Sequence, residues 1–184
     1  MKLVSVDKLV DYKFLKMYKL NLINRKNNPK EYLVASRREE KDLACKTGNH
    51  DKADAVMIVP ITKEKEFILL KQFRPAINDF IYEFPAGLID QGEDILKAAK
   101  RELFEETGLS AVDLEILLKP SYTSVGMSDE TVAVVKALVE GEISTDNAED
   151  DEEIEVVKIK ESEIKEFIKE NNVSIKTALM ILSI

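Results

Sequence analysis

Residues 87–109 read GLIDQGEDILKAAKRELFEETGL, and this stretch decides the fold. Asp94 is a favourable N-cap for a helix, and Gly108 suits the left-handed position that follows a helix end. Between them, residues suited to one buried face recur at helical spacing. They are Ile95, Ala98, Ala99, Leu103 and Thr107. The sequence therefore predicts a helix that is capped by Asp94, runs through Glu106 and packs against a core.

The exposed side of this helix carries an unusual set of charges. Glu102 and Glu106 are four residues apart, so their side chains leave the same helical face. Two carboxylates held that close repel each other unless a cation lies between them. Oxygen-only ligation with room for waters and phosphates suits Mg²⁺, with Mn²⁺ as the alternative. Arg101 precedes Glu105 by four residues and can orient it through an ion pair.

The loop before the helix adds a further candidate ligand. Gly87 and Gly92 allow the chain to bend back, so that the backbone carbonyl of Ala86 can reach the same metal. The alternative is a surface helix with solvated charges, which would be the better interpretation of Glu105 and Glu106 alone. The spacing of the whole set favours the metal site.

Composition restricts the class of protein. The 184 residues, 45% hydrophobic and 34% charged, are typical of one globular domain with a core. A net charge of −8 argues against nucleic-acid binding, whereas a phosphorylated small molecule stays compatible because a bound cation supplies the countercharge. No apolar run is long enough to cross a membrane, and the N-terminus becomes charged too early for a signal peptide. The single Cys45 fits the reducing cytoplasm.

The order of elements predicts an α/β fold. An extended strand pair is expected within residues 13–37, turning at Asn27-Asn28-Pro29, and a loop follows to residue 51. We therefore expect a small N-terminal β lobe at residues 1–50 and the main domain at residues 51–184. The main domain should form a mixed sheet with helices on both faces. Its expected strands are 55–62, 66–73, 80–84, 114–119, 131–140 and 154–159, and its further helices are 161–171 and 174–183.

The charged helix also matches a family signature. The pattern is Gly-x5-Glu-x7-Arg-Glu-apolar-x-Glu-Glu-x-Gly-apolar, and a chance match is on the order of 10⁻⁹ per starting position. It is matched at Gly87, Glu93, Arg101, Glu102, Leu103, Glu105, Glu106, Gly108 and Leu109. In this the chain resembles the Nudix hydrolases. The resemblance implies an α/β/α sandwich and hydrolysis of a nucleoside diphosphate linked to another group.

The resemblance assigns roles along the helix. Glu102 and Glu106 would be metal ligands, and Glu105 would be a ligand in some members or a catalytic group. Arg101 would orient Glu105, and Glu93 would support the loop or a metal-bound water. A metal is chemically apt here because it neutralises a pyrophosphate, activates water and holds the leaving oxygen.

Further residues resemble the ADP-ribose pyrophosphatase branch. Residues 71–76 read KQFRPA and residues 82–90 read YEFPAGLID. In that branch the arginine equivalent to Arg74 contacts the substrate's phosphates, and the residues equivalent to Tyr32 and Arg37 lie near the adenine. For Tyr32 the alternative is packing at an interface, and for Arg37 it is a solvated surface position.

Residues 124–130 resemble the branch's Ser-Pro-Gly loop that ends in a glutamate. Gly126 and Glu130 are thus candidate substrate residues, with Glu130 at the terminal ribose. Val125 replaces the usual proline, which leaves the loop freer and the exact substrate open.

The acidic stretch at residues 149–153 takes the place of the branch's catalytic carboxylate. Glu152 is the first candidate for general base and Asp150 the second. The alternative is a solvated acidic loop.

Three hypotheses of function remain. The first is metal-dependent hydrolysis of ADP-ribose to AMP and ribose 5-phosphate. The second is a Nudix hydrolase for another nucleoside-diphosphate sugar or a dinucleotide, and the third is a catalytically weak nucleotide-binding regulator. The branch is usually homodimeric, and pairing of N-terminal lobes would bury Phe14, Met17 and Leu20.

Overall fold

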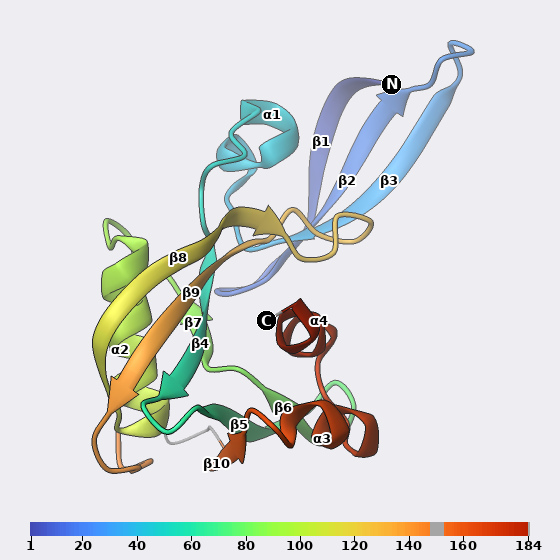
Figure 1. Cartoon of the computed structure of the whole chain (residues 1–184). Helices are drawn as coiled ribbons and strands as arrows, with labels where there is room; N and C mark the ends of the chain where they lie inside the picture. Colours follow the sequence, from blue (N-terminus) through green and yellow to red (C-terminus); the bar gives the residue numbers. More distant parts are fainter. Residues whose placement is uncertain (148–152, 184) are drawn as a thin grey trace. The chain divides into compact units, whose positions relative to one another are not determined.

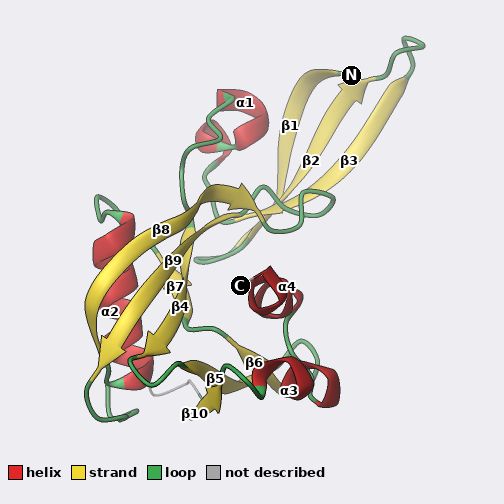
Figure 2. Ribbon diagram, viewed as in Figure 1, coloured by secondary structure: helices red, strands yellow, loops and turns green. Residues whose placement is uncertain are grey.

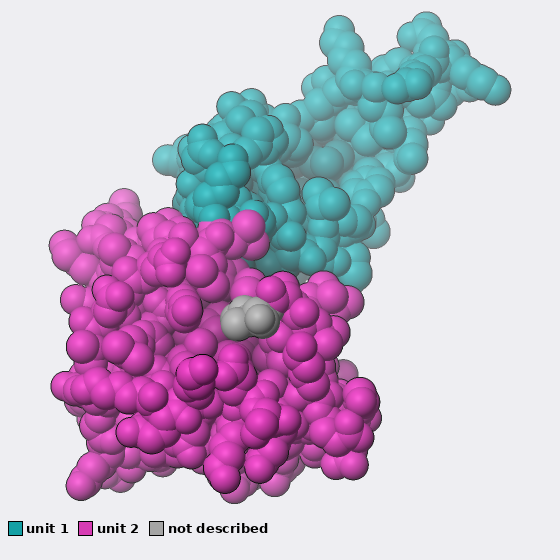
Figure 3. Space-filling model, in the orientation of Figure 1, with its two compact units in different colours: residues 1–54, 119–132 teal, residues 55–118, 133–184 magenta. Residues whose placement is uncertain are grey.

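The computed structural model describes residues 1–147 and 153–183 (Figure 1). These residues form two compact units, which Figure 3 colours separately. One unit comprises residues 1–54 and 119–132, and the other comprises residues 55–118 and 133–184. The N-terminal unit thus includes a later segment of the chain. The division into domains at residues 1–50 and 51–184 stays a prediction.

The N-terminal unit is built on a three-stranded antiparallel sheet in the order β1-β2-β3. Its strands are β1 (Lys2–Asp11), β2 (Lys16–Ile23) and β3 (Pro29–Ser36). The strand pair expected within residues 13–37 is present as β2 and β3. Strand β1 was missed, because charged residues interrupt its apolar alternation. Tyr18, Leu20 and Leu43 form the buried core of this unit.

The segment after β3 was expected to be a loop, and it contains two short helical turns. They are η1 (Glu40–Asp42) and α1 (Ala44–Thr47), and the second ends at Gly48 with φ 65°. Leu43 lies between them and is 1% exposed, so burial of one apolar side chain holds both turns to the sheet.

The second unit contains most of a seven-stranded sheet in the order β10-β5-β4-β9-β8, with β6 paired to β5 and β7 paired to β4. Strands β4 and β9 have the predicted bounds, β8 begins four residues earlier than predicted, and the three-residue β7 was missed. Figure 2 shows α2 on one side of β4 and β9, with α3 and α4 on the other. The predicted α/β class is confirmed. The elements are β4 (Ala55–Thr62), β5 (Glu66–Arg74), β6 (Asp79–Glu83), β7 (Ala86–Leu88), α2 (Ile95–Thr107), β8 (Ser110–Tyr122), β9 (Thr131–Glu140), β10 (Ile154–Lys160), α3 (Ile164–Glu170) and α4 (Ile175–Ser183).

Helix α2 begins and ends as the sequence predicts. The Asp94 side chain accepts hydrogen bonds from the N–H groups of Leu96 and Lys97, each at 3.0 Å, and Gly108 has φ 72°. The predicted apolar face packs into the core of this unit, where Ala98, Ala99 and Leu103 are fully buried beside β4, β5 and β9. The opposite side of α2 is thereby left for its charged residues. Within the described residues, no helix is long and apolar enough to span a membrane.

Candidate active site

Arg101 is the centre of the charged side of α2. Its guanidinium donates to Glu93 at 2.9 and 3.1 Å, to Glu102 at 2.8 Å, to Glu105 at 3.0 Å and to the carbonyl of Leu88 at 2.9 Å. The predicted ion pair with Glu105 is present, but Glu93 is the residue that accepts two hydrogen bonds from Arg101. These hydrogen bonds hold the pKa of Glu93 below its ordinary value. Arg101 therefore ties the loop before α2 to the helix.

Glu106 is a buried carboxylate that contacts the strand before this loop. Glu106 is only 3% exposed, and its Oε2 accepts the N–H of Ala86 at 3.0 Å. A carboxylate is rarely buried unless it is paired or hydrogen-bonded. The bond fixes one end of β7 against the last turn of α2.

Glu102 lies against the next residue of the same strand. A Cβ added at Gly87 would lie 1.9 Å from the Cδ of Glu102 and 2.0 and 2.1 Å from its two oxygens. Gly87 has no positive φ. The expectation that Gly87 serves to bend the loop is therefore wrong: it leaves space for a carboxylate, and only Gly92, with φ 86°, has the left-handed conformation of a turn glycine.

The first turn of α4 and the residue before it bond to Phe84 and to β6, just ahead of β7. The N–H of Phe84 donates to the hydroxyl of Thr177 at 2.9 Å, and the N–H of Ser174 donates to the carbonyl of Tyr82 at 3.0 Å. Thr177 is 1% exposed. These bonds hold the segment that leads from β6 into β7.

The arrangement fits a hard divalent cation by its donors. The carboxylates of Glu102 and Glu106 lie against consecutive residues of β7, and the Ala86 carbonyl belongs to the same strand. Mg²⁺ prefers such oxygen donors and keeps sites for waters and substrate phosphates. Among the described residues, no group of three or more histidine, cysteine, aspartate or glutamate side chains is arranged so that it could hold a metal ion. Arg101 pairs with Glu102 and Glu105 in this state.

Arg74 has a partner that the sequence reasoning missed. Its Nε donates to the Oε2 of Glu83 at 2.6 Å, between the paired strands β5 and β6. The Glu83 side chain is 15% exposed and that of Arg74 is 45% exposed. The signal was present in the sequence, because Glu83 stands among aromatic residues within the family-like YEFPAG run, but its partner lies on another strand.

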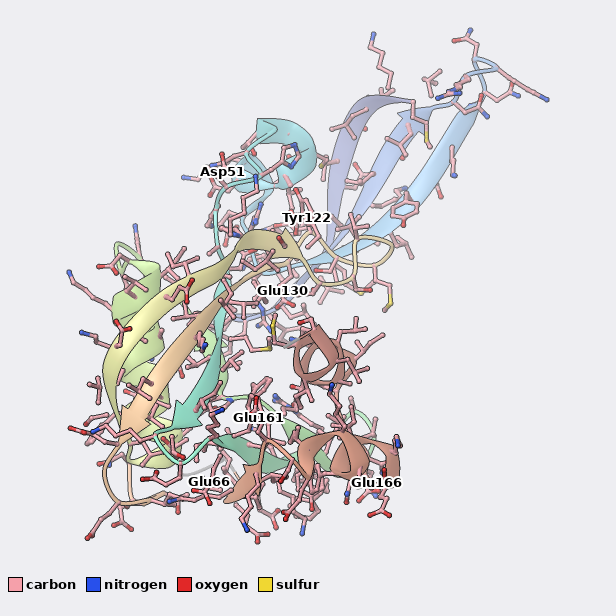
Figure 4. All side chains as sticks on the ribbon, viewed as in Figure 1. Asp51, Glu66, Tyr122, Glu130, Glu161 and Glu166 are labelled. Atoms are coloured by element: carbon pink, nitrogen blue, oxygen red, sulfur yellow. The ribbon has the colours of Figure 1, made fainter. Side chains whose placement is uncertain are left out.

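Four predicted substrate residues pair with one another in the N-terminal unit. The Tyr32 hydroxyl donates to the Gly126 carbonyl at 2.5 Å. The Nε of Arg37 donates to Oε1 of Glu130 at 2.5 Å, and Thr123 donates to the other oxygen at 3.2 Å. Figure 4 shows Glu130 in the loop before β9. Arg37 is therefore an exposed side chain that pairs with an acid, and its role near the adenine stays a prediction.

Arg38 is a buried cation that sequence reasoning also missed. It is 3% exposed, and its Nε and Nη2 donate to the two oxygens of Asp54 at 3.0 and 2.7 Å. Burial disfavours its charge, but the hydrogen bonds and charge of Asp54 outweigh that effect and raise the pKa of Arg38. This bidentate pair ties the end of β3 to the segment before β4. No apolar periodicity marks such a residue in the sequence.

The acidic stretch and Val125 were also expected to bear on the site. Asp150 and Glu152, the candidates for general base, lie outside the described residues. Val125 is 71% exposed at the surface of the loop that carries Gly126 and Glu130. Its side chain is therefore not part of the core.

The chain is similar to several known proteins. A family model described as NUDIX domain matches residues 51–177. The chain is 40% identical over 111 residues to an ADP-ribose pyrophosphatase of Saccharomyces cerevisiae, covering 55% of this chain and 48% of that protein. It is 33% identical over 122 residues to a methanol dehydrogenase activator of Bacillus methanolicus, covering 65% and 64%. The matches thus span about half to two thirds of these relatives.

A solved structure confirms the predicted α/β/α sandwich with a mixed sheet. It is a crystal structure of an ADP compounds hydrolase, and it matches with a TM-score of 0.75 over 99% of this chain and 91% of that chain. At 22% identity this likeness shows the fold alone.

Proposed function

The chain belongs to the Nudix family, and from that premise we propose that it hydrolyses the pyrophosphate of ADP-ribose to AMP and ribose 5-phosphate. The observation that carries the proposal is the contact of Glu102 and Glu106 with consecutive residues of β7. That contact gives two carboxylates a fixed position beside one strand. The relatives named as ADP-ribose pyrophosphatases support the choice of substrate.

Glu102, Glu106 and Glu105, with the carbonyl of Ala86, would hold the divalent metal. We expect Mg²⁺, with Mn²⁺ as the alternative. When bound, the metal would neutralise the pyrophosphate and lower the pKa of a water. Glu106 contributes a carboxylate already fixed by the Ala86 N–H, which reduces the reorganisation required.

Arg101 and Glu93 would act as positioning residues. Arg101 holds Glu102 and Glu105 through one nitrogen, and Glu93 holds Arg101 through two bonds. Because Arg101 also bonds the Leu88 carbonyl, it keeps the strand and the helix in register. With a cation bound, Glu102 and Glu105 would serve as ligands, and Glu93 would keep the guanidinium of Arg101 in place through its two hydrogen bonds.

Substrate phosphates would bind at Arg74. Glu83 holds this side chain through Nε, and a guanidinium held in that way presents its other nitrogens as a fork suited to phosphate oxygens. Tyr32 and Arg37 would lie near the base, and Gly126 and Glu130 near the terminal ribose. Glu152, or in second place Asp150, would take the proton of the attacking water.

A substrate panel is the direct test. Purified protein would be assayed for monophosphate release from ADP-ribose, other nucleoside-diphosphate sugars and dinucleotides, with Mg²⁺ and Mn²⁺ varied. We expect ADP-ribose to give the highest kcat/KM. A second nucleoside-diphosphate sugar or a dinucleotide as the best substrate would support the alternative that Val125 raises, because valine does not constrain the loop as proline would.

Glu106→Gln tests the metal assignment. It keeps the size and the acceptor for the Ala86 N–H but removes the charge, so we expect nearly all activity to be lost while the circular dichroism spectrum is kept. Lys100→Ala, on an exposed position of the same helix, is the matched control. Full metal-dependent turnover by Glu106→Gln would refute the site.

We also propose a cytoplasmic homodimer. The N-terminal sheet and the turn between β1 and β2 expose several apolar side chains, which a second copy would cover. They are Val4, Leu9, Tyr12, Phe14, Leu15 and Leu33. Light scattering during size-exclusion chromatography measures the mass, and a value of about 21 kDa, that of one chain, would contradict the dimer.

A further inference from the structure

The ion pair between Arg37 and Glu130 joins two segments that are 93 residues apart in the chain. Its two side chains are 37% and 22% exposed. An ion pair at such partly exposed positions contributes little to stability, because solvent screens the attraction. It is therefore too weak by itself to hold the two segments at a fixed spacing, and the structure beneath the pair must do so.

That structure is a buried cluster centred on Asp54. Arg38 directly follows Arg37 in the chain, and it is 3% exposed. Thr131 directly follows Glu130, and it is fully buried. Asp54 is 8% exposed, and all of these residues belong to the N-terminal unit. The cluster is thus made of the immediate neighbours of the ion pair and of one carboxylate between them.

Asp54 bonds to both neighbours. Its Oδ1 accepts from the Nε of Arg38 at 3.0 Å, and its Oδ2 accepts from Nη2 at 2.7 Å. The same Oδ2 accepts the backbone N–H of Thr131 at 3.0 Å, and the backbone N–H of Asp54 donates to the Thr131 carbonyl at 3.0 Å. The Thr131 hydroxyl accepts from Nη2 of Arg38 at 3.3 Å. The three residues therefore form a closed set of hydrogen bonds, which links the two segments.

The backbone on the other side of each member of the ion pair is also held. Before Arg37, Ser36 is 1% exposed, and its hydroxyl accepts the N–H of Arg38 at 3.0 Å. Before Glu130, the hydroxyl of Ser128 accepts the N–H of Glu130 at 2.9 Å. Hydrogen bonds therefore fix the backbone around both side chains.

Stability by itself does not explain why charged residues are buried in this cluster. Removing two charges from water is costly, and apolar residues of similar volume are often at least as stabilising as a buried ion pair. A guanidinium that donates two hydrogen bonds to one carboxylate also fixes a direction and a distance. The contact of Arg38 with Asp54 is therefore suited to holding two segments in a defined position.

We propose that Asp54 is a positioning residue for substrate binding, which sets the spacing of Arg37 and Glu130 through Arg38 and Thr131. The proposal rests on the proposed function, in which Arg37 lies near the base and Glu130 near the terminal ribose. Loss of the Asp54 carboxylate would keep both side chains but would release the segments that carry them. It should therefore weaken the binding of ADP-ribose more than it slows the chemical step, because none of these residues is a proposed metal ligand.

The first measurement uses the full chain and needs neither substrate nor metal. The chain has five arginines, so labelling with ¹⁵N-arginine gives few Nε–H signals, and loss of a signal in Arg37→Lys identifies that of Arg37. The bond to Glu130 should protect this N–H from exchange with water. Asp54→Asn should speed the exchange at least about tenfold, as expected for a weakened hydrogen bond to a charged group. Exchange at Nε of Arg101, which donates to Glu93, should stay unchanged.

Steady-state kinetics with ADP-ribose then separates binding from chemistry. Asp54→Asn should raise KM about tenfold and change kcat by less than about threefold. Asp51→Asn makes the same chemical change at an exposed position of the same segment, so as the matched control it should leave KM and exchange unchanged. In a Glu130→Ala background, Asp54→Asn should raise KM little further, because the ion pair that it positions is already lost.

Unchanged exchange at Arg37 in Asp54→Asn, or a lower Tm with an unchanged KM, would overturn the proposal. Effects of Asp54→Asn and Glu130→Ala on KM that simply add would overturn it as well. Arg38→Lys keeps the charge but loses the two-bond contact, so it should give smaller changes in the same direction. No change in Arg38→Lys would overturn the proposal even where Asp54→Asn fails to fold.

Failure of the proposed function has a different result. Absence of ADP-ribose turnover in the wild type would contradict that function. Faster exchange at Arg37 in Asp54→Asn would still support the role of Asp54 in holding the ion pair, because this measurement does not depend on catalysis.

Discussion

Gly87→Ala should separate the position of one carboxylate from the stability of the fold. The added Cβ would stand 1.9 Å from the Cδ of Glu102, and ordinary contact begins at 3.4 Å. The carboxylate must therefore move by about 1.5 Å. Alanine is compatible with the backbone itself, because Gly87 has no positive φ. The strain thus falls on the flexible end of the Glu102 side chain.

The expected cost to activity is much larger than the cost to stability. A misplacement of about 1 Å can lower a rate about 10²-fold, so we expect kcat/KM for ADP-ribose to fall by about 10² or more. An off-rotamer side chain costs about 0.5–1.5 kcal/mol. For a chain of this size that lowers Tm by only about 1–6 °C. The ion pair between Glu102 and Arg101 is partly exposed and adds little.

The assay compares four proteins: wild type, Gly87→Ala, Glu102→Asp and the double variant. Aspartate is shorter by one bond of about 1.5 Å, which withdraws the carboxylate from the added methyl group. In the double variant the two losses should therefore not add, and coupling between the two positions should be evident in kcat/KM. Thermal unfolding of each protein provides the stability control.

Wild-type kcat/KM in Gly87→Ala would contradict this prediction, since it would mean that the carboxylate can leave its place beside β7 without effect. Fully additive losses in the double variant would also contradict it. A collapse of Tm by far more than the side-chain strain predicts would show that the methyl group displaces backbone instead.

The remaining predictions concern a salt bridge, a positioning residue and a cap. Hydrogen bonds from Arg101 lower the pKa of Glu93 from 4.5, so the ionised Glu93 stabilises the fold above that pH, and this stabilisation is lost as the pH falls through the lowered pKa. Glu93→Gln should therefore lower Tm at pH 7 and make Tm less sensitive to acid. A loss of Tm that is equal at pH 7 and at an acid pH below the lowered pKa would contradict this. Glu83→Gln should release Arg74 and raise KM for ADP-ribose about tenfold with a smaller change in kcat, measured by steady-state kinetics; an unchanged KM would exclude the positioning role. Asp94→Ala should remove about 1 kcal/mol of stability with kcat unchanged, whereas Asp94→Asn should keep the cap and serve as the control in thermal unfolding.

Much of the fold could be predicted because its signals are local. The strands β4 and β9 were predicted with the bounds that the structure has, since their apolar runs are bounded by charged residues or turns. Strand β1 was missed because lysines and aspartates interrupt its pattern, and β7 was missed because three residues carry too short a pattern. Strand β1 is held by the next strand, β2, and β7 is held by β4, which comes from an earlier part of the chain.

The candidate site was predictable in its members but not in its contacts. Arg101 and Glu105 are one helical turn apart, so their pairing follows from helix geometry. The pairs of Arg74 with Glu83 and of Arg38 with Asp54 join different segments. Nothing in residue spacing along the chain specifies such partners, because they depend on which segments become neighbours on folding.

By itself, the sequence determined the capped helix α2, the carboxylates that it carries and the family to which their spacing belongs. These features depend on the backbone of one helix, where 3.6 residues complete a turn and fix which side chains share a face. Only the tertiary structure decided that Gly87 makes room for Glu102, that the Ala86 N–H holds a buried Glu106, and that Asp54 bonds to both Arg38 and Thr131. Each of these features combines side chains and backbone from segments that are separated in the sequence. They come into contact only because those segments pack closely in the folded chain.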